Sequence, residues 1–149
     1  MNSALRPVIG MRHLLRRRAA LALALALGLA GASFAKTEFD GVTVVVADAV
    51  HGAAERRVDD PEQVATIVEE VNAVRRKSWS SWQGKLANCA VRLSFHGADG
   101  RVGALVLQGD ELIELGASRT AGTRRELGNF EAPVTRRLAA RIRKPSDCK

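Results

Sequence analysis

A cysteine, a histidine and an aspartate lie close together in the segment NCAVRLSFHGADGRV, residues 88–102. These residue types bind metals or form nucleophilic centres when their side chains converge. The segment also alternates apolar and polar residues, which is typical of a strand whose successive side chains point to opposite faces. Cys89 then points to the core, and His96 points to the other face about 23 Å further along, at about 3.3 Å per residue. We therefore expect neither a zinc site nor a cysteine–histidine pair here, and we expect Asp99 to form a turn.

The other candidates for catalysis are two histidines and several carboxylates. Beyond residue 35 the chain contains only His51 and His96 as histidines. A metal site would need both of them with a carboxylate such as Asp48, and no HxH or HExxH spacing supports one. The neighbouring Glu69 and Glu70 are expected on the solvated face of a helix. The sequence therefore predicts no catalytic residues, no metal ligands and no cofactor.

Two tryptophans stand three positions apart in the segment WSSWQG. Tryptophan is enriched in the energetic centres of binding surfaces, so Trp79 and Trp82 are candidate binding residues. The alternative is that they cover the end of a helix and part of the core. Solvent exposure distinguishes the two hypotheses, because exposed indoles favour binding and buried ones favour packing.

Positive charge is concentrated near the C-terminus, in Arg119, Arg124, Arg125, Arg136, Arg137, Arg141, Arg143 and Lys144. Within a helix, the spacing of Arg137, Arg141 and Lys144 places them on one face. This face is either solvated, with arginine stems shielding the sheet, or it docks to an anionic envelope component such as lipid, cell-wall polymer or an acidic protein. The candidate binding residues are Trp79, Trp82, Arg124, Arg125, Arg137 and Arg141.

The first 35 residues are predicted to be a secretory signal peptide. Arg12 and the triplet 16–18 form a basic region, and the apolar run AALALALALGLA that follows is too short to span a bilayer core of roughly 30 Å. Ser33 and Ala35 suit the −3 and −1 positions of a cleavage site. We predict a start at Met1 or Met11, cleavage between Ala35 and Lys36, and export to the periplasm rather than to the medium. No transmembrane segment is expected in the remaining chain.

Removing the signal peptide changes the charge of the protein. The chain has 23 Lys and Arg residues against 16 Asp and Glu, and five of the basic residues but no acidic ones lie in the first 35 positions. The domain of residues 36–149 therefore carries 18 Lys and Arg residues against 16 Asp and Glu residues, so its net charge is close to zero. A nucleic-acid partner is not predicted.

Cys89 and Cys148 are the only two cysteines in the chain. Because an exported protein folds in an oxidising compartment, an even pair predicts a disulfide bond. The bond would fasten a C-terminal tail that would otherwise fray.

The clearest predicted element is a helix over residues 61–77. Asp60 is placed as its N-cap and Pro61 at its first position. The apolar stripe of this helix consists of Val64, Ile67, Val68, Val71 and Val74. A second helix is expected over 133–144.

The predicted strands cover 41–50, 89–96, 101–107 and 111–115, and a fourth meander strand is placed near 124–127. Residues 51–60 and 78–88 are expected to be a polar loop and an irregular segment. The predicted fold class is α+β, in the order β-α-β-β-β-(β)-α. It has an antiparallel meander of three to four strands, an N-terminal strand, and two helices on one face.

These features favour a small exported, non-catalytic binding protein of inhibitor, immunity or envelope-accessory type. Its expected partner is an envelope protein or an anionic envelope component. One alternative is a small envelope hydrolase that pairs His51 or His96 with a carboxylate. The other is a structural envelope component without a single ligand.

Overall fold

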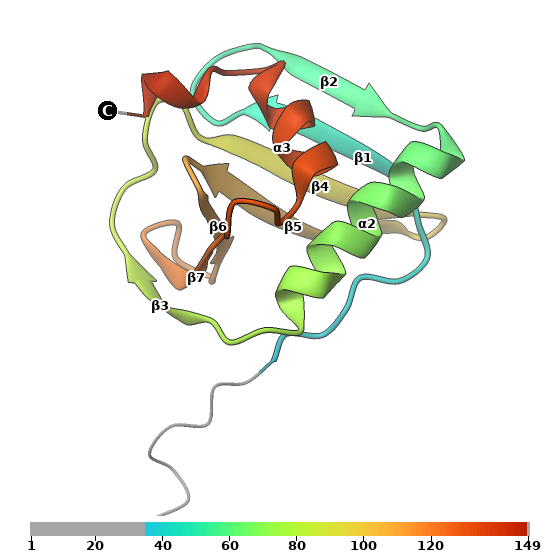
Figure 1. Cartoon of the computed structure of the whole chain (residues 1–149), viewed down its shortest axis with the longest axis horizontal. Coiled ribbons are helices and arrows are strands. Elements are labelled where there is room, and N and C mark those ends of the chain that lie inside the picture. Colours follow the sequence, from blue (N-terminus) through green and yellow to red (C-terminus); the bar gives the residue numbers. More distant parts are fainter. Residues whose placement is uncertain (1–34, 149) are drawn as a thin grey trace, which may run out of the picture. The chain divides into compact units, whose positions relative to one another are not determined.

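The computed structural model of the protein describes residues 35–148. The predicted signal peptide lies outside the described residues, apart from Ala35. Seven strands form one antiparallel sheet in the order β2-β1-β4-β5-β6-β7-β3, and two α-helices cover one of its faces (Figure 1). The strands are β1 (Val42–Ala49), β2 (Glu55–Val58), β3 (Ser80–Gln83), β4 (Val91–Gly97), β5 (Gly100–Gln108), β6 (Glu111–Leu115) and β7 (Ala121–Glu126). The helices are α2 (Pro61–Arg75) and α3 (Pro133–Ala140), and a 3₁₀ turn, η1 (Pro145–Asp147), follows.

The predicted α+β class with an antiparallel meander is confirmed. Strands β4, β5, β6 and β7 follow one another in both sequence and space, and β1 pairs with β4 on the other side. The fourth meander strand is real and begins earlier than predicted, at Ala121. Helix α3 ends at Ala140, which is earlier than predicted, and its C-terminal cap is Arg141.

Two segments predicted to be irregular are short strands at the two edges of the sheet. Strand β2 lies in the expected loop 51–60 and pairs with β1, and β3 lies in the expected irregular segment 78–88 and pairs with β7. Each is four residues long and shows three exposed residues with one buried residue. Because each strand buries only one side chain, its sequence shows no alternation of apolar and polar residues. These strands therefore form through backbone pairing with a longer neighbouring strand.

The main core lies between the helices and the sheet. Asp60 caps α2 by accepting a hydrogen bond from the Gln63 amide at 2.9 Å, as its position predicts. The predicted stripe of α2 faces the sheet, where it meets Val91, Leu93 and Phe95 of β4. The core residues of the stripe are Val64, Ile67, Val71 and Val74, with Val68 partly buried beside them.

The segment before β1 is fastened to α2. The side-chain amide of Asn72 accepts from the Phe39 amide at 2.8 Å and donates to the Phe39 carbonyl at 2.9 Å. The Phe39 ring lies 4.7 Å from the ring of Phe95 and directly over Gly103, where any side chain would collide with it. Residues 36–40 therefore belong to the folded domain.

Arg75, near the end of α2, is buried beside this segment. Its Nε donates to the Thr37 carbonyl at 2.6 Å, and its guanidinium lies 4.0 Å from the centre of the Phe39 ring. Burial lowers the pKa of Arg75 below its usual value, and an ion pair with Glu114 at 3.4 Å opposes this shift. Arg75 is thus both a positive charge in the last turn of α2 and a residue that packs in the interior.

A smaller apolar cluster lies on the sheet face away from the helices. It contains Trp82, Ala90, Val106 and Ile113, with Leu86 and two other partly buried residues against it. The chain between β3 and β4 therefore covers part of this second face.

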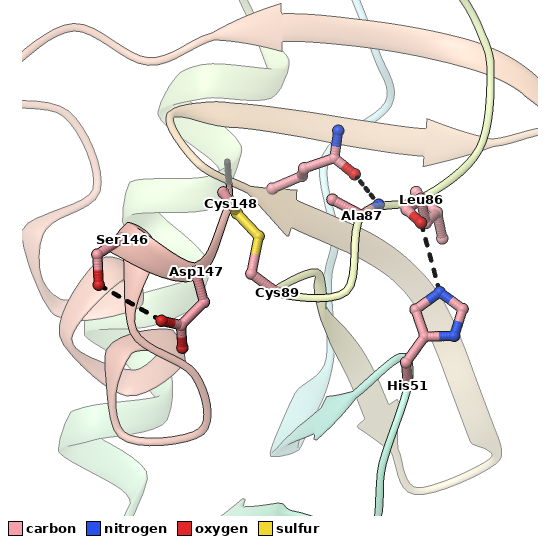
Figure 2. The surroundings of a disulfide bond; sticks show 8 residues. His51, Leu86, Ala87, Cys89, Ser146, Asp147 and Cys148 are labelled. Carbon is pink, nitrogen blue, oxygen red and sulfur yellow. Dashed lines mark hydrogen bonds between the residues drawn. A yellow bond between two sulfur atoms is a disulfide. The ribbon is translucent and has the colours of Figure 1, made fainter.

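The predicted disulfide bond between Cys89 and Cys148 is confirmed, and their Cα atoms are 5.2 Å apart. Figure 2 shows the bond linking the chain just before β4 to the C-terminal segment. Arg143 also holds this segment by donating to the His51 carbonyl. None of the described helices has the length and apolar character needed to cross a bilayer.

Candidate functional site: a groove between β2, α2 and α3

The two tryptophans do not form an exposed pair. Trp79 is half-buried after α2, where its Nε1 donates to the Val74 carbonyl at 3.3 Å and its ring packs against the main core. Trp82 is only 7% exposed and belongs to the smaller cluster on the opposite face of the sheet. Their role in binding stays a prediction, and the packing that the sequence allowed as an alternative accounts for their positions.

Arg124 and Arg125 of β7 both make contacts within the protein. Arg124 forms an ion pair with Glu111 of the neighbouring strand at 2.6 Å. Arg125 donates to the Ser78 carbonyl at 3.1 Å and lies 3.9 Å from the carboxylate of Glu131. These contacts tie β7 to its surroundings, so a ligand would compete with existing partners for either guanidinium.

Arg137 and Arg141 differ from the arginines of β7. Both are exposed on the α3 side of a groove, and within residues 35–148 neither forms an ion pair. Arg56 of β2 lies on the same groove and is equally without an ion-pair partner among the described residues. The groove therefore has three guanidinium groups available to an incoming anion.

The groove has a volume of about 660 Å³ and lies between β2, the first half of α2, and α3. Its buried floor consists of Val58, Ile67 and Leu138, with Val134 beside them. The exposed residues that surround this floor are Arg56, Asp60, Glu62, Gln63, Thr66, Arg137 and Arg141. The site is thus apolar at the bottom and charged at the top.

Strand pairing places Arg56 in this groove. Arg56 lies opposite Ala47 of β1, and Val58 lies opposite Val45, both of which are buried under the helices. Because side chains two positions apart share a face, Arg56 must also lie on the helix-covered face. An inward-pointing charge on an edge strand also hinders pairing with another chain. Sequence reasoning missed Arg56 because its segment was interpreted as a loop.

The chemistry of the groove suits a ligand with an anionic group and an apolar part. A guanidinium offers a planar fork of donors that matches a carboxylate or phosphate. Asp60 and Glu62 place negative charge on the α2 side, where Asp60 is already engaged as the helix cap. The positive charges of the three arginines outnumber the negative charges of these two carboxylates, so the groove carries a net positive charge.

The histidines lie elsewhere. His51 is exposed after β1, with its Nε2 atom 3.4 Å from the Leu86 carbonyl oxygen, near the disulfide bond (Figure 2). Asp48 is 3.9 Å from Arg92, and His96 is half-buried on β4. Among residues 35–148, no group of three or more His, Cys, Asp or Glu side chains is arranged to hold a metal ion.

Comparison of the chain with protein-family models, with curated proteins and with solved structures found no match.

Proposed function

We propose that this protein is a small exported binding protein that acts without catalysis, as an inhibitor, an immunity protein or an accessory of an envelope component. The observation that carries the proposal is the groove, where Arg56, Arg137 and Arg141 surround an apolar floor. Export rests on the signal-peptide pattern of the first 35 residues. The disulfide bond is consistent with folding in an oxidising compartment.

The chemistry of the groove favours an acidic segment of an envelope protein as the ligand. A carboxylate of that segment would meet the arginines, and a neighbouring apolar side chain would contact the floor. An anionic lipid surface fits less well, because its extended charge would also lie against Asp60 and Glu62, whereas a single carboxylate of a protein segment can be confined to the arginine side of the groove. The hydrolase alternative gains no support from this site, since neither His51 nor His96 is among the residues that line it.

Charge reversal in the groove tests the proposal. The double variant Arg137→Glu/Arg141→Glu is compared with Arg101→Glu/Arg119→Glu, which makes the same change in net charge at exposed positions outside the groove. The readout is the dissociation constant for the envelope protein captured by the wild type. The groove variant should raise this constant at least about tenfold, which corresponds to about 1.4 kcal/mol.

Two results would contradict the proposal. Equal weakening by both double variants would mean that bulk charge, and not the groove, attracts the partner. Equally tight binding of the wild type to vesicles containing phosphatidylglycerol would identify a lipid surface as the ligand instead.

A further inference from the structure

Phe130 is the most exposed large apolar side chain of the described protein, with 96% of its surface accessible. The other phenylalanines of this region, Phe39 and Phe95, are both buried in the core. Phe130 lies between the end of β7 at Glu126 and the start of α3 at Pro133. Figure 1 shows the course of the chain between these two elements. A single exposed apolar residue is common on protein surfaces, so its exposure alone carries no conclusion.

The turn that presents Phe130 is held in place on both sides. The Gly128 amide donates to the Glu131 carboxylate at 2.8 Å, and the Glu131 amide donates back to the Gly128 carbonyl at 3.1 Å. Arg136 of α3 donates to the same Gly128 carbonyl at 2.8 Å. Residues 128–131 therefore form a closed turn with Phe130 near its tip.

The backbone next to this turn adopts an unfavourable conformation. Ala132 has φ 51° and ψ 49°, which is the left-handed region, and no other described non-glycine residue has a positive φ. Such a conformation persists only where the surrounding structure imposes it, and it is found preferentially at functional sites. The backbone is therefore strained at Ala132, next to a turn whose largest side chain, Phe130, does not pack in the core of the protein.

The charges around the turn are paired with one another. Glu131 forms an ion pair with Lys77 and lies 3.9 Å from Arg125, and Arg136 lies 3.5 Å from Asp110. Binding to anionic lipid headgroups would need free basic groups beside the aromatic ring. Because these basic groups already have carboxylate partners, the turn fits an apolar pocket on a protein better than it fits a membrane surface.

We propose that Phe130 is the anchor of a protein–protein contact, in which the turn 128–131 inserts the phenyl ring into an apolar pocket of a partner protein. An aromatic ring on an ordered turn loses little conformational freedom on binding, and such anchors dominate the energetics of interfaces. This inference stands on the turn alone and does not rest on the groove or its ligand.

The test places the photoreactive amino acid p-benzoylphenylalanine at position 130 of the full chain, produced in its native cells. The control chain carries the same probe at Ser118, which is exposed in the turn between β6 and β7. Illumination should give a discrete adduct with another protein from position 130 and none from position 118. An equal pattern from both positions, an adduct with lipid, or an adduct only with a second copy of this chain would overturn the proposal.

Competition measures the contribution of the ring. Purified wild-type protein and Phe130→Leu should suppress the adduct at similar concentrations, because both side chains fill an apolar pocket. Phe130→Ala should need at least about 30 times more protein, as expected for an anchor residue. Equal suppression by Phe130→Ala would overturn the proposal. A melting temperature of Phe130→Ala clearly below that of the wild type would also overturn it, since Phe130 would then be part of the fold.

Discussion

Glu70 of α2 caps the start of α3 through Thr135. Its carboxylate accepts hydrogen bonds from the Thr135 amide at 2.9 Å and from the Thr135 hydroxyl at 2.8 Å, and it accepts a third from the Val134 amide at 2.9 Å. The residue in the usual capping position is Ala132, which has no side chain able to accept these bonds. A carboxylate from a neighbouring helix therefore satisfies the free amides at this helix start. The expectation that Glu70 lies on the solvated face of α2 was wrong.

Replacing Glu70 should destabilise the protein strongly. Glu70→Ala leaves the fully buried Thr135 and two amides without an acceptor, so the free energy of unfolding should fall by about 2 kcal/mol. Urea denaturation measures the loss. Glu69→Ala is the matched control, because Glu69 is exposed on the same helix and should change stability by less than about 0.5 kcal/mol. Similar values for the two variants would contradict the capping role.

The disulfide bond should contribute a large share of the stability. It links residues 59 positions apart, for which loop-closure entropy sets an upper contribution of about 4 kcal/mol. Reduction should lower the free energy of unfolding by about 3 kcal/mol, measured by denaturation with and without reductant. The variant Cys89→Ala/Cys148→Ala should have the same free energy of unfolding as the reduced wild type, and reductant should not change it. If reductant destabilised this variant as well, the effect would not come from the disulfide bond.

The pairing of Asn72 with Phe39 should be essential for the start of the folded domain. Asn72→Ala removes one acceptor and one donor from a buried backbone segment, so about 2 kcal/mol of stability should be lost. Amide hydrogen exchange of residues 36–40 should accelerate more than that of β4. Asn88→Ala makes the same substitution at an exposed position and serves as the control. Unchanged exchange in 36–40 would show that the Phe39 ring and the hydrogen bonds to Arg75 hold the segment without Asn72.

We predict that signal cleavage between Ala35 and Lys36 leaves the pairing of Asn72 with Phe39 intact. The amide of Lys36 donates to the Arg75 carbonyl at 2.9 Å, so a chain that begins at Lys36 keeps the contacts of residues 36–40 with α2. The intact mass of the exported protein should correspond to a start at Lys36, two hydrogens lighter than the reduced chain. A start beyond Phe39 would contradict the prediction, because it would remove a core side chain.

Periodicity was sufficient to predict α2 and the central strands, because each of these elements buries one face along several turns or residues. Asp60, Pro61 and the valine stripe define α2 locally, and the alternation around Leu93 defines β4. The number of cysteines and the predicted compartment were sufficient to predict the pairing of Cys89 with Cys148. In the groove, helical spacing alone predicted that Arg137 and Arg141 lie together.

The remaining features depend on residues that are far apart in the sequence. Arg56 joins the groove because β2 pairs with β1, and Glu70 caps a helix that begins more than sixty positions later. Trp82 is buried because β3 joins the edge of the sheet, while Phe130 is exposed because its turn closes upon itself. Local patterns record which residues prefer burial. Burial and pairing at these positions are set by distant segments, and they are defined once the chain has closed around its core.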